Sequence, residues 1–403
     1  MEARPIKPTQ RGERIITLDV IRGFSLLGIL LVNMQFFIAP KLFLMLSGVS
    51  LFEGPASNTA NWFITIFATG KFFTTFSFLF GIGFFLFMER IKAKGLSVGK
   101  VYIRRLFFLL LLGLIHAFLF WSGDILLNYA IAGFFLLLFR KSSIEKIKKW
   151  AIGLFSVVIF LTGFLTFLST LVENVLDEDI APMNDWTNLV DEAIVIFQNG
   201  SFSEILAFRL AEEIPLIIAN FIITVPMVLF IFLIGLYVGK KGVLLNIASH
   251  FEWIRKVSKN SLIYGTVLTL LFIILKTELF IVPFYLHEAA VEVLSLVSGL
   301  VISFFYISSI TLLCQQEQWR ERLKFLAPVG QMALTNYLLQ TVICLLLFNG
   351  YGLGFYGKVT PEVGILSTFV IFTFQIFLSK FWMSRFKYGP LEHVWRSFTY
   401  KGI

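Results

Sequence analysis

Residues 18–38 read LDVIRGFSLLGILLVNMQFFI, an apolar run long enough to cross a bilayer that carries two opposite charges, Asp19 and Arg22, within one helical turn. A helix needs about 20 apolar residues to span the hydrocarbon core. A charge inside the core costs on the order of 2.5 to 3.5 kcal/mol on insertion scales, so an ionisable pair there is a candidate functional site. The run predicts a membrane helix, and because no small-residue cleavage site closes it, we expect an uncleaved signal anchor.

The composition extends this prediction to the whole chain. Of 403 residues, 57% are hydrophobic and only 15% are charged, which is too few for a water-soluble surface. Spanning lengths of about 20 residues give ten candidate helices, within a range of nine to eleven. They lie at residues 17–38, 61–88, 105–121, 124–140, 149–172, 213–238, 261–276, 289–314, 328–348 and 364–383. The second is overlong and contains Gly70 and Lys71, where we expect a kink or a tilt.

Basic residues are distributed unevenly over the loops. Of 34 Lys and Arg residues, 27 fall in the N-terminal tail and on alternate loops, and only four fall on the opposite loops. Those four are Lys41, Arg209, Lys276 and Lys358. Because cytoplasmic loops carry the excess of basic residues, we expect an even number of spans and both termini in the cytoplasm. The sequence thus predicts one all-α transmembrane bundle over residues 1–403 in the cell membrane, with a long extracytoplasmic loop at residues 173–212.

Common catalytic and metal-binding motifs are missing from the sequence. There is no P-loop, no Gly-x-Ser-x-Gly elbow and no dinucleotide fingerprint. His287-Glu288 with Glu292 resembles half of a zinc-protease motif, but the second histidine is missing, so we expect no metal site. The net charge of +9 follows the loop pattern, and we expect the bilayer rather than nucleic acid as the partner.

The segment GLIHAFLFWSGDILLNYA, residues 113–130, holds the strongest chemical candidates, His116 and Asp124. At 1.5 Å per residue, His116 lies about 7 to 8 Å from a helix end at Trp121, and the Ser-Gly turn brings Asp124 onto the next helix. A histidine oriented by a carboxylate is the arrangement that general-base catalysis needs. The alternative is structural: Asp124 is also a good N-cap, and a histidine near an interface can bond a carbonyl.

Four amides also fall inside predicted helices: Asn33, Asn128, Asn336 and Gln340. Asn336 and Gln340 share one helix face by their spacing of four residues. Such amides more often join helices than touch substrate. Glu212 and Glu213 complement a helix dipole at the predicted outer side and are second-rank candidates.

Five segments together resemble the YeiB family of bacterial multi-pass membrane proteins. They are residues 14–33, 78–83, 116–129, 328–337 and 389–396. The Leu-Asp-x-x-Arg-Gly opening also resembles the transmembrane acyltransferases, including heparan-α-glucosaminide N-acetyltransferase and the sugar O-acyltransferases of acyltransferase family three. In those enzymes an acyl group from cytoplasmic acyl-CoA reaches an acceptor at or beyond the membrane, and a histidine is the base or acyl carrier. Here no histidine follows the first helix, where those families place theirs, so the role falls to His116.

The resemblance and the charges together predict an acyl-CoA-dependent acyltransferase. We expect Arg22, Arg104 and Arg105 to hold the CoA phosphates, and His116 with Asp124 to activate the acceptor, a small molecule or glycan. Acyl-CoA would be a cosubstrate, with no permanently bound cofactor. Asp19 and the four amides would bind substrate or join helices. The alternative is a transporter with a polar path and no bond made; a non-catalytic scaffold and a homodimer also stay open.

Overall fold

The computed structural model describes residues 15–175, 186–244, 246–279 and 283–401, and these residues form helices and connecting turns, with no strand among them. The helices are α1 (Ile16–Ile38), α2 (Lys41–Ser47), α3 (Pro55–Phe67), α4 (Lys71–Ala93), α5 (Val98–Ile115), α6 (Leu126–Leu138), α7 (Ile144–Val175), α8 (Trp186–Asn199), α9 (Phe202–Phe208), α10 (Ile214–Lys240), α11 (Phe251–Lys276), α12 (Phe284–Leu313), α13 (Glu317–Leu323), α14 (Ala327–Gln331), α15 (Ala333–Phe348), α16 (Pro361–Arg385) and α17 (Pro390–Tyr400). Two π-helical turns, η2 (His116–Phe120) and η3 (Arg209–Glu213), and two 3-10 turns, η4 (Ala248–His250) and η5 (Lys324–Leu326), complete the set.

Eight helical segments of the described chain are long and apolar enough to cross a membrane. A ninth, Glu317–Gln331 with Ala333–Phe348, is bent by 76° at its break. The predicted span at 124–140 is shorter than expected, because α6 has only 13 residues. At 1.5 Å per residue α6 is about 20 Å long, whereas the hydrocarbon core is about 30 Å thick. The prediction of a multi-pass helical bundle is confirmed.

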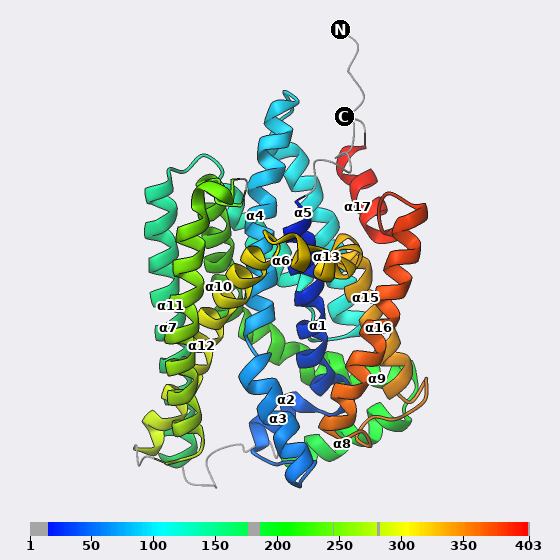
Figure 1. Ribbon diagram of the computed structural model, residues 1–403. Helices are drawn as coiled ribbons and strands as arrows, with labels where there is room; N and C mark the ends of the chain where they lie inside the picture. Colours follow the sequence, from blue (N-terminus) through cyan, green and yellow to red (C-terminus); the bar gives the residue numbers. More distant parts are fainter. Residues whose placement is uncertain (1–14, 176–185, 245, 280–282, 402–403) are drawn as a thin grey trace.

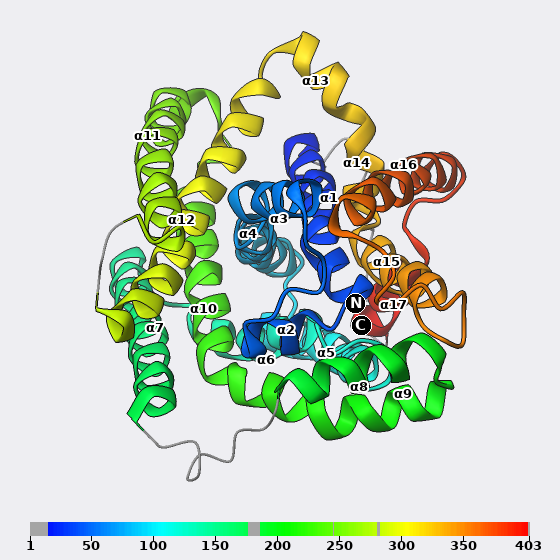
Figure 2. The same ribbon diagram turned by 90° about the horizontal axis from the view of Figure 1, so that it is seen from below.

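The helices form two groups (Figure 1). Helices α7, α10, α11 and α12 stand together at one side, and we call them the wing; α1 lies in the middle of the rest, which we call the body (Figure 2). Helix α4 packs on α10 and α12 and so joins the two groups. The start of α1 and helix α17 lie at one end of the bundle, the terminal face, whereas α2, α3 and α8 lie at the other end, the distal face (Figure 1).

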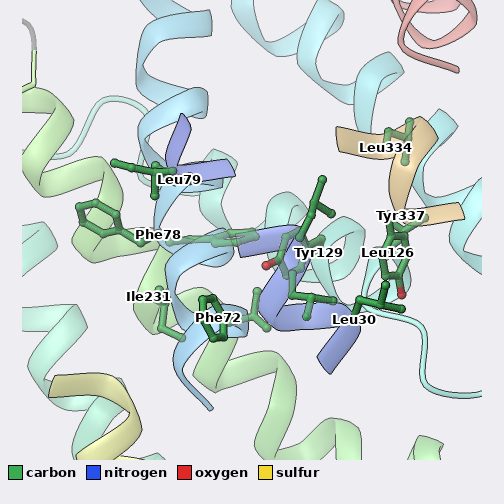
Figure 3. Close-up of a cluster of buried hydrophobic side chains, with 14 of the residues drawn as sticks. Leu30, Phe72, Phe78, Leu79, Leu126, Tyr129, Ile231, Leu334 and Tyr337 are labelled. Carbon is green, nitrogen blue, oxygen red and sulfur yellow. The ribbon is translucent and has the colours of Figure 1, made fainter. Parts of the chain in front are cut away.

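The core of the body surrounds α1. This helix buries apolar residues on all of its faces, as expected of a helix in the middle of a bundle, and contacts α4, α14, α15 and α16. Figure 3 shows part of this core, with Leu30 of α1, Phe72 and Phe78 of α4, and Tyr129 of α6. The Tyr129 and Ser77 hydroxyls are 2.7 Å apart, so even this largely apolar region ties α4 to α6 by a polar contact.

Helix α14 lies directly against α1 at the predicted Asp19–Arg22 pair. A Cβ on Gly330 would sit 1.9 Å from the Asp19 carbonyl oxygen, and a Cβ on Gly23 would sit 2.3 Å from that of Leu326. Small residues at such positions let helix backbones approach closely in membranes. The charged turn of α1 is therefore sealed on one side by the broken span.

The break before α15 is stabilised by the C-terminal helix α17. Glu392 Oε1 accepts hydrogen bonds from the N–H groups of Leu334 (2.8 Å) and Thr335 (3.0 Å), and its Oε2 accepts one from the Thr335 hydroxyl (2.6 Å). The first N–H groups of any helix lack partners within that helix. A carboxylate from 58 positions further along the chain thus caps α15.

Two other predicted segments are refined by the structure. The overlong second helix is interrupted between α3 and α4, where Gly70 has a positive φ of 76°. Lys71 follows it, is 3% exposed, and donates from Nζ to the Thr65 carbonyl (2.8 Å). Within the predicted loop at 173–212, residues 176–185 lie outside the described residues, and the rest contains α8, which buries Val190 and Phe197.

Candidate functional site

His116 and Asp124 lie together in the structure, as the sequence predicts. The Nδ1 atom of His116 is 2.7 Å from Oδ1 of Asp124, and the two residues are 3% and 6% exposed. The second oxygen of Asp124 accepts the Leu127 N–H (2.7 Å), so the carboxylate also caps the start of α6. The catalytic and the capping readings of Asp124 are therefore compatible, because each uses a different oxygen.

The other nitrogen of His116 faces a third residue, Thr341 of α15. Nε2 of His116 is 3.0 Å from Oγ1 of Thr341, which is 1% exposed. With Asp124 ionised, Nδ1 carries the ring proton, and Nε2 is left as the acceptor for the Thr341 hydroxyl. Carboxylate, imidazole and hydroxyl thus form one buried chain, which is the order of groups in a serine-type catalytic triad.

A π-helical turn at the end of α5 places His116. In η2 the Trp121 N–H donates to the His116 carbonyl (2.8 Å), five residues back. Such wider turns occur frequently at functional sites because they re-aim a side chain within a helix. One turn earlier, a Cβ on Gly113 would lie 2.6 Å from the Leu127 nitrogen, so glycine lets α5 meet α6 beside the Asp124 carboxylate.

Aromatic rings enclose the imidazole. The Tyr337 and Trp121 ring centroids lie 5.4 Å and 6.3 Å from that of His116, and Phe37 of α1 packs on Trp121 at 4.4 Å. The Tyr337 hydroxyl accepts the Ile125 N–H (3.3 Å) and so lies next to the Asp124 turn. Buried polar groups in such surroundings interact more strongly than they do in water.

A second π-helical turn, η3, meets the first. Arg209 of η3 is 1% exposed, and its Nη1 donates to the Leu119 carbonyl of η2 (3.1 Å). Its Nε lies 3.7 Å from Oε2 of Glu213 in the same turn. These two π-helical turns are therefore linked by a buried guanidinium.

A small cavity of about 50 Å³ opens beside these turns toward the distal face. Its wall includes Trp121, Ser122 and Gly123 of the turn between η2 and α6, Glu213 of η3 and Lys41 of α2. A second cavity of about 180 Å³ shares Lys41 with the first and is also lined by Gln35 and Asn61. Burial, with a smaller contribution from the charge of Lys276, lowers the pKa of the Lys41 ammonium. Groups of both charge signs thus face the space next to Asp124.

The three arginines predicted to bind phosphates lie toward the terminal face. Arg22 pairs with Asp19, with Nη1 2.9 Å from Oδ1. The Arg105 guanidinium stacks on the Trp395 ring of α17 at 3.6 Å, while Trp395 Nε1 donates to the Arg105 carbonyl (2.9 Å). Arg104 is exposed and donates to the Lys401 carbonyl (2.6 Å). The C-terminal helix therefore covers this end of α5.

Arg105 and Arg22 are close enough to influence each other electrostatically, and Arg396 of α17 adds a third cation to them. The chain thus brings two of the three predicted arginines together and adds one that the sequence reading did not single out. The sequence contained a signal for Arg396, because this residue follows Trp395 on the amphipathic C-terminal helix α17.

The predicted amides divide into a buried network and two separate positions. Asn336 Nδ2 donates to Ser379 Oγ (2.9 Å), and Gln340 Nε2 donates to Gln375 Oε1 (2.9 Å), so α15 is tied to α16. Gln375 Nε2 in turn donates to the Asn336 carbonyl (2.8 Å). Asn128 accepts from the Thr224 hydroxyl (3.0 Å) between α6 and α10, and Asn33 is half-buried on α1, apart from the network.

Sequence reading missed Thr341 and Tyr337 as members of the site. A signal was present, because these two residues are four apart and share a face of α15, next to the face of Asn336 and Gln340. Nothing local to residues 113–130, however, indicates that α15 is the helix opposite His116, since the contact joins residues 225 positions apart.

Comparisons with known proteins give a consistent picture. A family model described as "Protein of unknown function (DUF418)" matches residues 238–402, which include Thr341 and Glu392. Uncharacterized protein YxaH of Bacillus subtilis is 33% identical over 98% of this chain and 96% of its own length. Uncharacterized protein YeiB of Escherichia coli is 29% identical over 96% of each chain. An uncharacterized 39.9 kDa protein from the amylase 3' region of Bacillus acidopullulyticus is 30% identical over 98% of this chain and 96% of its own.

No solved protein structure matches the chain. The sequence similarity, in contrast, extends over nearly the full length of each relative, and the family model covers the C-terminal helix α17. The chain therefore belongs to the YeiB-like family of membrane proteins.

Proposed function

We propose that the protein is a membrane acyltransferase that moves an acyl group from acyl-CoA to a hydroxyl or amine acceptor, with His116 as the general base. One observation carries the proposal: a buried imidazole lies between a carboxylate, 2.7 Å from Nδ1, and a hydroxyl, 3.0 Å from Nε2. An imidazole held in this way removes a proton from a hydroxyl and returns it to a leaving group. Polar groups inside a membrane bundle are costly, which favours a functional reason for them.

The cations at the terminal face support an anionic donor. Arg22, Arg105 and Arg396 influence one another electrostatically there, and Arg22 is paired with the Asp19 carboxylate at 2.9 Å. CoA carries several phosphate charges, which a cluster of arginines attracts. The excess of basic residues on the loops of this side supports its assignment as the cytoplasmic face, where acyl-CoA is available.

The cavities at the distal face support an acceptor on the opposite side. Ser122 and Gly123, which directly precede Asp124 in the sequence, line the smaller cavity. Glu213 and Lys41 line it as well. A carboxylate binds hydroxyl or ammonium groups, and an ammonium binds carbonyl or anionic oxygens. Such a wall suits a small polar acceptor that approaches His116 from the side opposite the donor.

Acyl transfer by the purified protein in liposomes tests the proposal. The probe is acetyl-CoA labelled in the acetyl group, supplied with a lipid and glycan extract of bacterial membranes. We expect label in the extract with the wild type and with His287→Gln, and at least a 100-fold lower rate with His116→Gln. His287 is a matched control because it is also buried and contacts a carboxylate, Glu288, at 3.3 Å. Equal rates for the two variants would exclude His116 as the base.

Solute transport is the second candidate, and one observation favours it. Buried polar groups succeed one another along α15, from Asn336 through Gln340 to Thr341, and Thr341 in turn contacts His116 of η2. Such a series can line a path through a membrane bundle. Thermal stability separates the two functions, because a ligand stabilises the state that binds it according to its concentration and Kd. Stabilisation by CoA favours the transferase. Stabilisation by a small solute, without any stabilisation by CoA, favours the transporter.

A further inference from the structure

Thr341 directs its hydroxyl away from its own helix. Buried serines and threonines in this protein commonly donate to the carbonyl four residues back: Ser25 to Ile21 (2.7 Å), Thr368 to Gly364 (3.0 Å). Such back-bonding is the usual arrangement for these residues within helices. The Thr341 hydroxyl instead lies 3.0 Å from His116 Nε2, on a different helix.

The surroundings of this hydroxyl meet the requirements for an activated nucleophile. A hydroxyl is a weak nucleophile unless a base removes its proton, and the base must itself be oriented by a third group. His116 is that base, and Asp124, 2.7 Å from its other nitrogen, orients it. All three side chains are buried, so water competes little for their hydrogen bonds.

Thr341 lies partway along its helix, where a covalent intermediate could pass an acyl group from one side of the membrane to the other. Thr341 is the ninth residue of α15, which begins at Ala333 beside Glu392 and ends at Phe348. At 1.5 Å per residue it lies about 12 Å from the helix start. A group in that position can receive an acyl chain from one side of the membrane and release it to the other.

We propose that Thr341 is the catalytic nucleophile and carries the acyl group as an ester; this inference rests on the proposed acyltransferase function. In the first step Thr341 Oγ attacks the thioester carbonyl and passes its proton to His116 Nε2, and CoA leaves as the thiol with that proton. In the second step the acceptor hydroxyl or amine attacks the ester carbonyl and gives its proton to His116. The Thr341 oxygen then leaves and takes the proton back, which restores the starting state.

The covalent intermediate is tested with acetyl-CoA alone, before any acceptor is added. We expect the wild type to gain one acetyl group on the peptide that contains Thr341, detected by mass spectrometry, together with one equivalent of CoA thiol. Thr341→Ser keeps the hydroxyl and should be acetylated at the same residue. Thr341→Val should gain no acetyl group there and lose at least 100-fold in transfer rate. Thr368→Val is the control, since Thr368 is equally buried but bonded within its own helix.

The outcomes separate this inference from the function on which it rests. Transfer by Thr341→Val at the wild-type rate would refute the nucleophile and leave the acyltransferase intact, as would an acetyl group found on His116 instead. A wild type without any transfer would refute both. If Thr341→Val does not fold, the site of acetylation in the wild type and in Thr341→Ser decides the question.

Discussion

The body and the wing are both helical, but they differ in the regularity of their helices and in their buried polar contacts. In the body, several helices are short, broken or locally widened, and buried charged groups make hydrogen bonds there: His116 with Asp124, Arg209 with the η2 carbonyl, and Glu392 with the start of α15. In the wing, α7, α11 and α12 are long and continuous, and only 11% and 22% of the most apolar stretches of α7 and α11 are buried. Polar contacts there are modest, such as that between the Ser258 and Ser309 hydroxyls at 2.9 Å.

The difference indicates where the protein concentrates its functional constraints. Regular apolar helices are the low-cost solution in lipid, because every backbone group is satisfied internally. Irregular turns and buried charges persist only where the surrounding structure holds them, and they gather at functional sites. Each region contains one buried histidine beside a carboxylate, so substitutions at equivalent positions compare the regions directly.

Loss of the orienting carboxylate should have the largest effect. We expect Asp124→Asn to lower acetyl transfer by about 100-fold or more, because the amide can present a donor to Nδ1 and so invert the tautomer of His116. Glu288→Gln, beside His287 in the wing, should leave the rate within about twofold. The rates are measured with labelled acetyl-CoA in liposomes. If both substitutions slow transfer equally, the contrast between the regions is lost.

Removal of the buried guanidinium should have the next largest effect, now on stability. Arg209→Met leaves the Leu119 carbonyl and Glu213 without their partner, and loss of one member of a buried pair costs about 3 to 5 kcal/mol. Arg255→Met on α11, where Arg255 is exposed, should change stability by about 0.5 kcal/mol at most. Thermal unfolding in detergent measures both variants. A small effect of Arg209→Met would show that the two π-helical turns hold together without it.

Glu392 should make the stability of the body depend on pH. Burial raises the pKa of its carboxyl from the ordinary value of 4.5, against the lowering effect of hydrogen bonds from Thr335 and Leu334. The folded protein therefore binds this proton more tightly than the unfolded chain, and Glu392 contributes most stability below pH 4.5, with the contribution falling as pH rises through the raised pKa. Glu392→Gln keeps an acceptor for the two N–H groups and should remove this dependence. Melting temperatures of both proteins between pH 4 and 8, with Glu252→Gln on exposed α11 as control, test the sign.

The smallest contrast concerns hydrogen bonds between helices. Double-mutant cycles within a membrane bundle give about 0.6 kcal/mol on average and about 1.7 kcal/mol at most. We expect the coupling energy of Ser258 with Ser309 in the wing to lie at or below that average. The coupling energy of Gln340 with Gln375 in the body should exceed it, because this pair belongs to a connected network. Alanine cycles scored by unfolding in detergent measure both coupling energies. Equal values would mean that the network of the body adds nothing beyond its pairs.

The sequence predicted those features that depend on local pattern. Apolar runs located the spans. The short distance in sequence from His116 to Asp124 placed their side chains together on adjacent helices, because seven intervening residues that include a Ser-Gly turn leave little freedom. The short α6 escaped prediction because apolar residues continue to Phe139, whereas its helix begins only at Leu126, after the capping turn. Hydropathy alone does not predict the residue at which a turn ends and a helix begins.

Contacts between distant segments were beyond the reach of the sequence. Thr341 meets His116 and Glu392 meets Thr335 only after the helices have packed, and a single chain carries no record of such pairings. The segment at 328–348 was predicted as an unbroken helix, because its apolar residues reach a spanning length. At the break before α15, α14 lies close against α1 at Gly330.

The cap on α15 also sets an order of events during biosynthesis. Glu392 follows Leu334 by 58 positions, so at roughly 5 to 20 residues per second it is made several seconds after the start of α15. Until then the N–H groups of Leu334 and Thr335 lack the acceptor that Glu392 provides. The contact between α17 and the start of α15 can thus form only after α15 itself has been made.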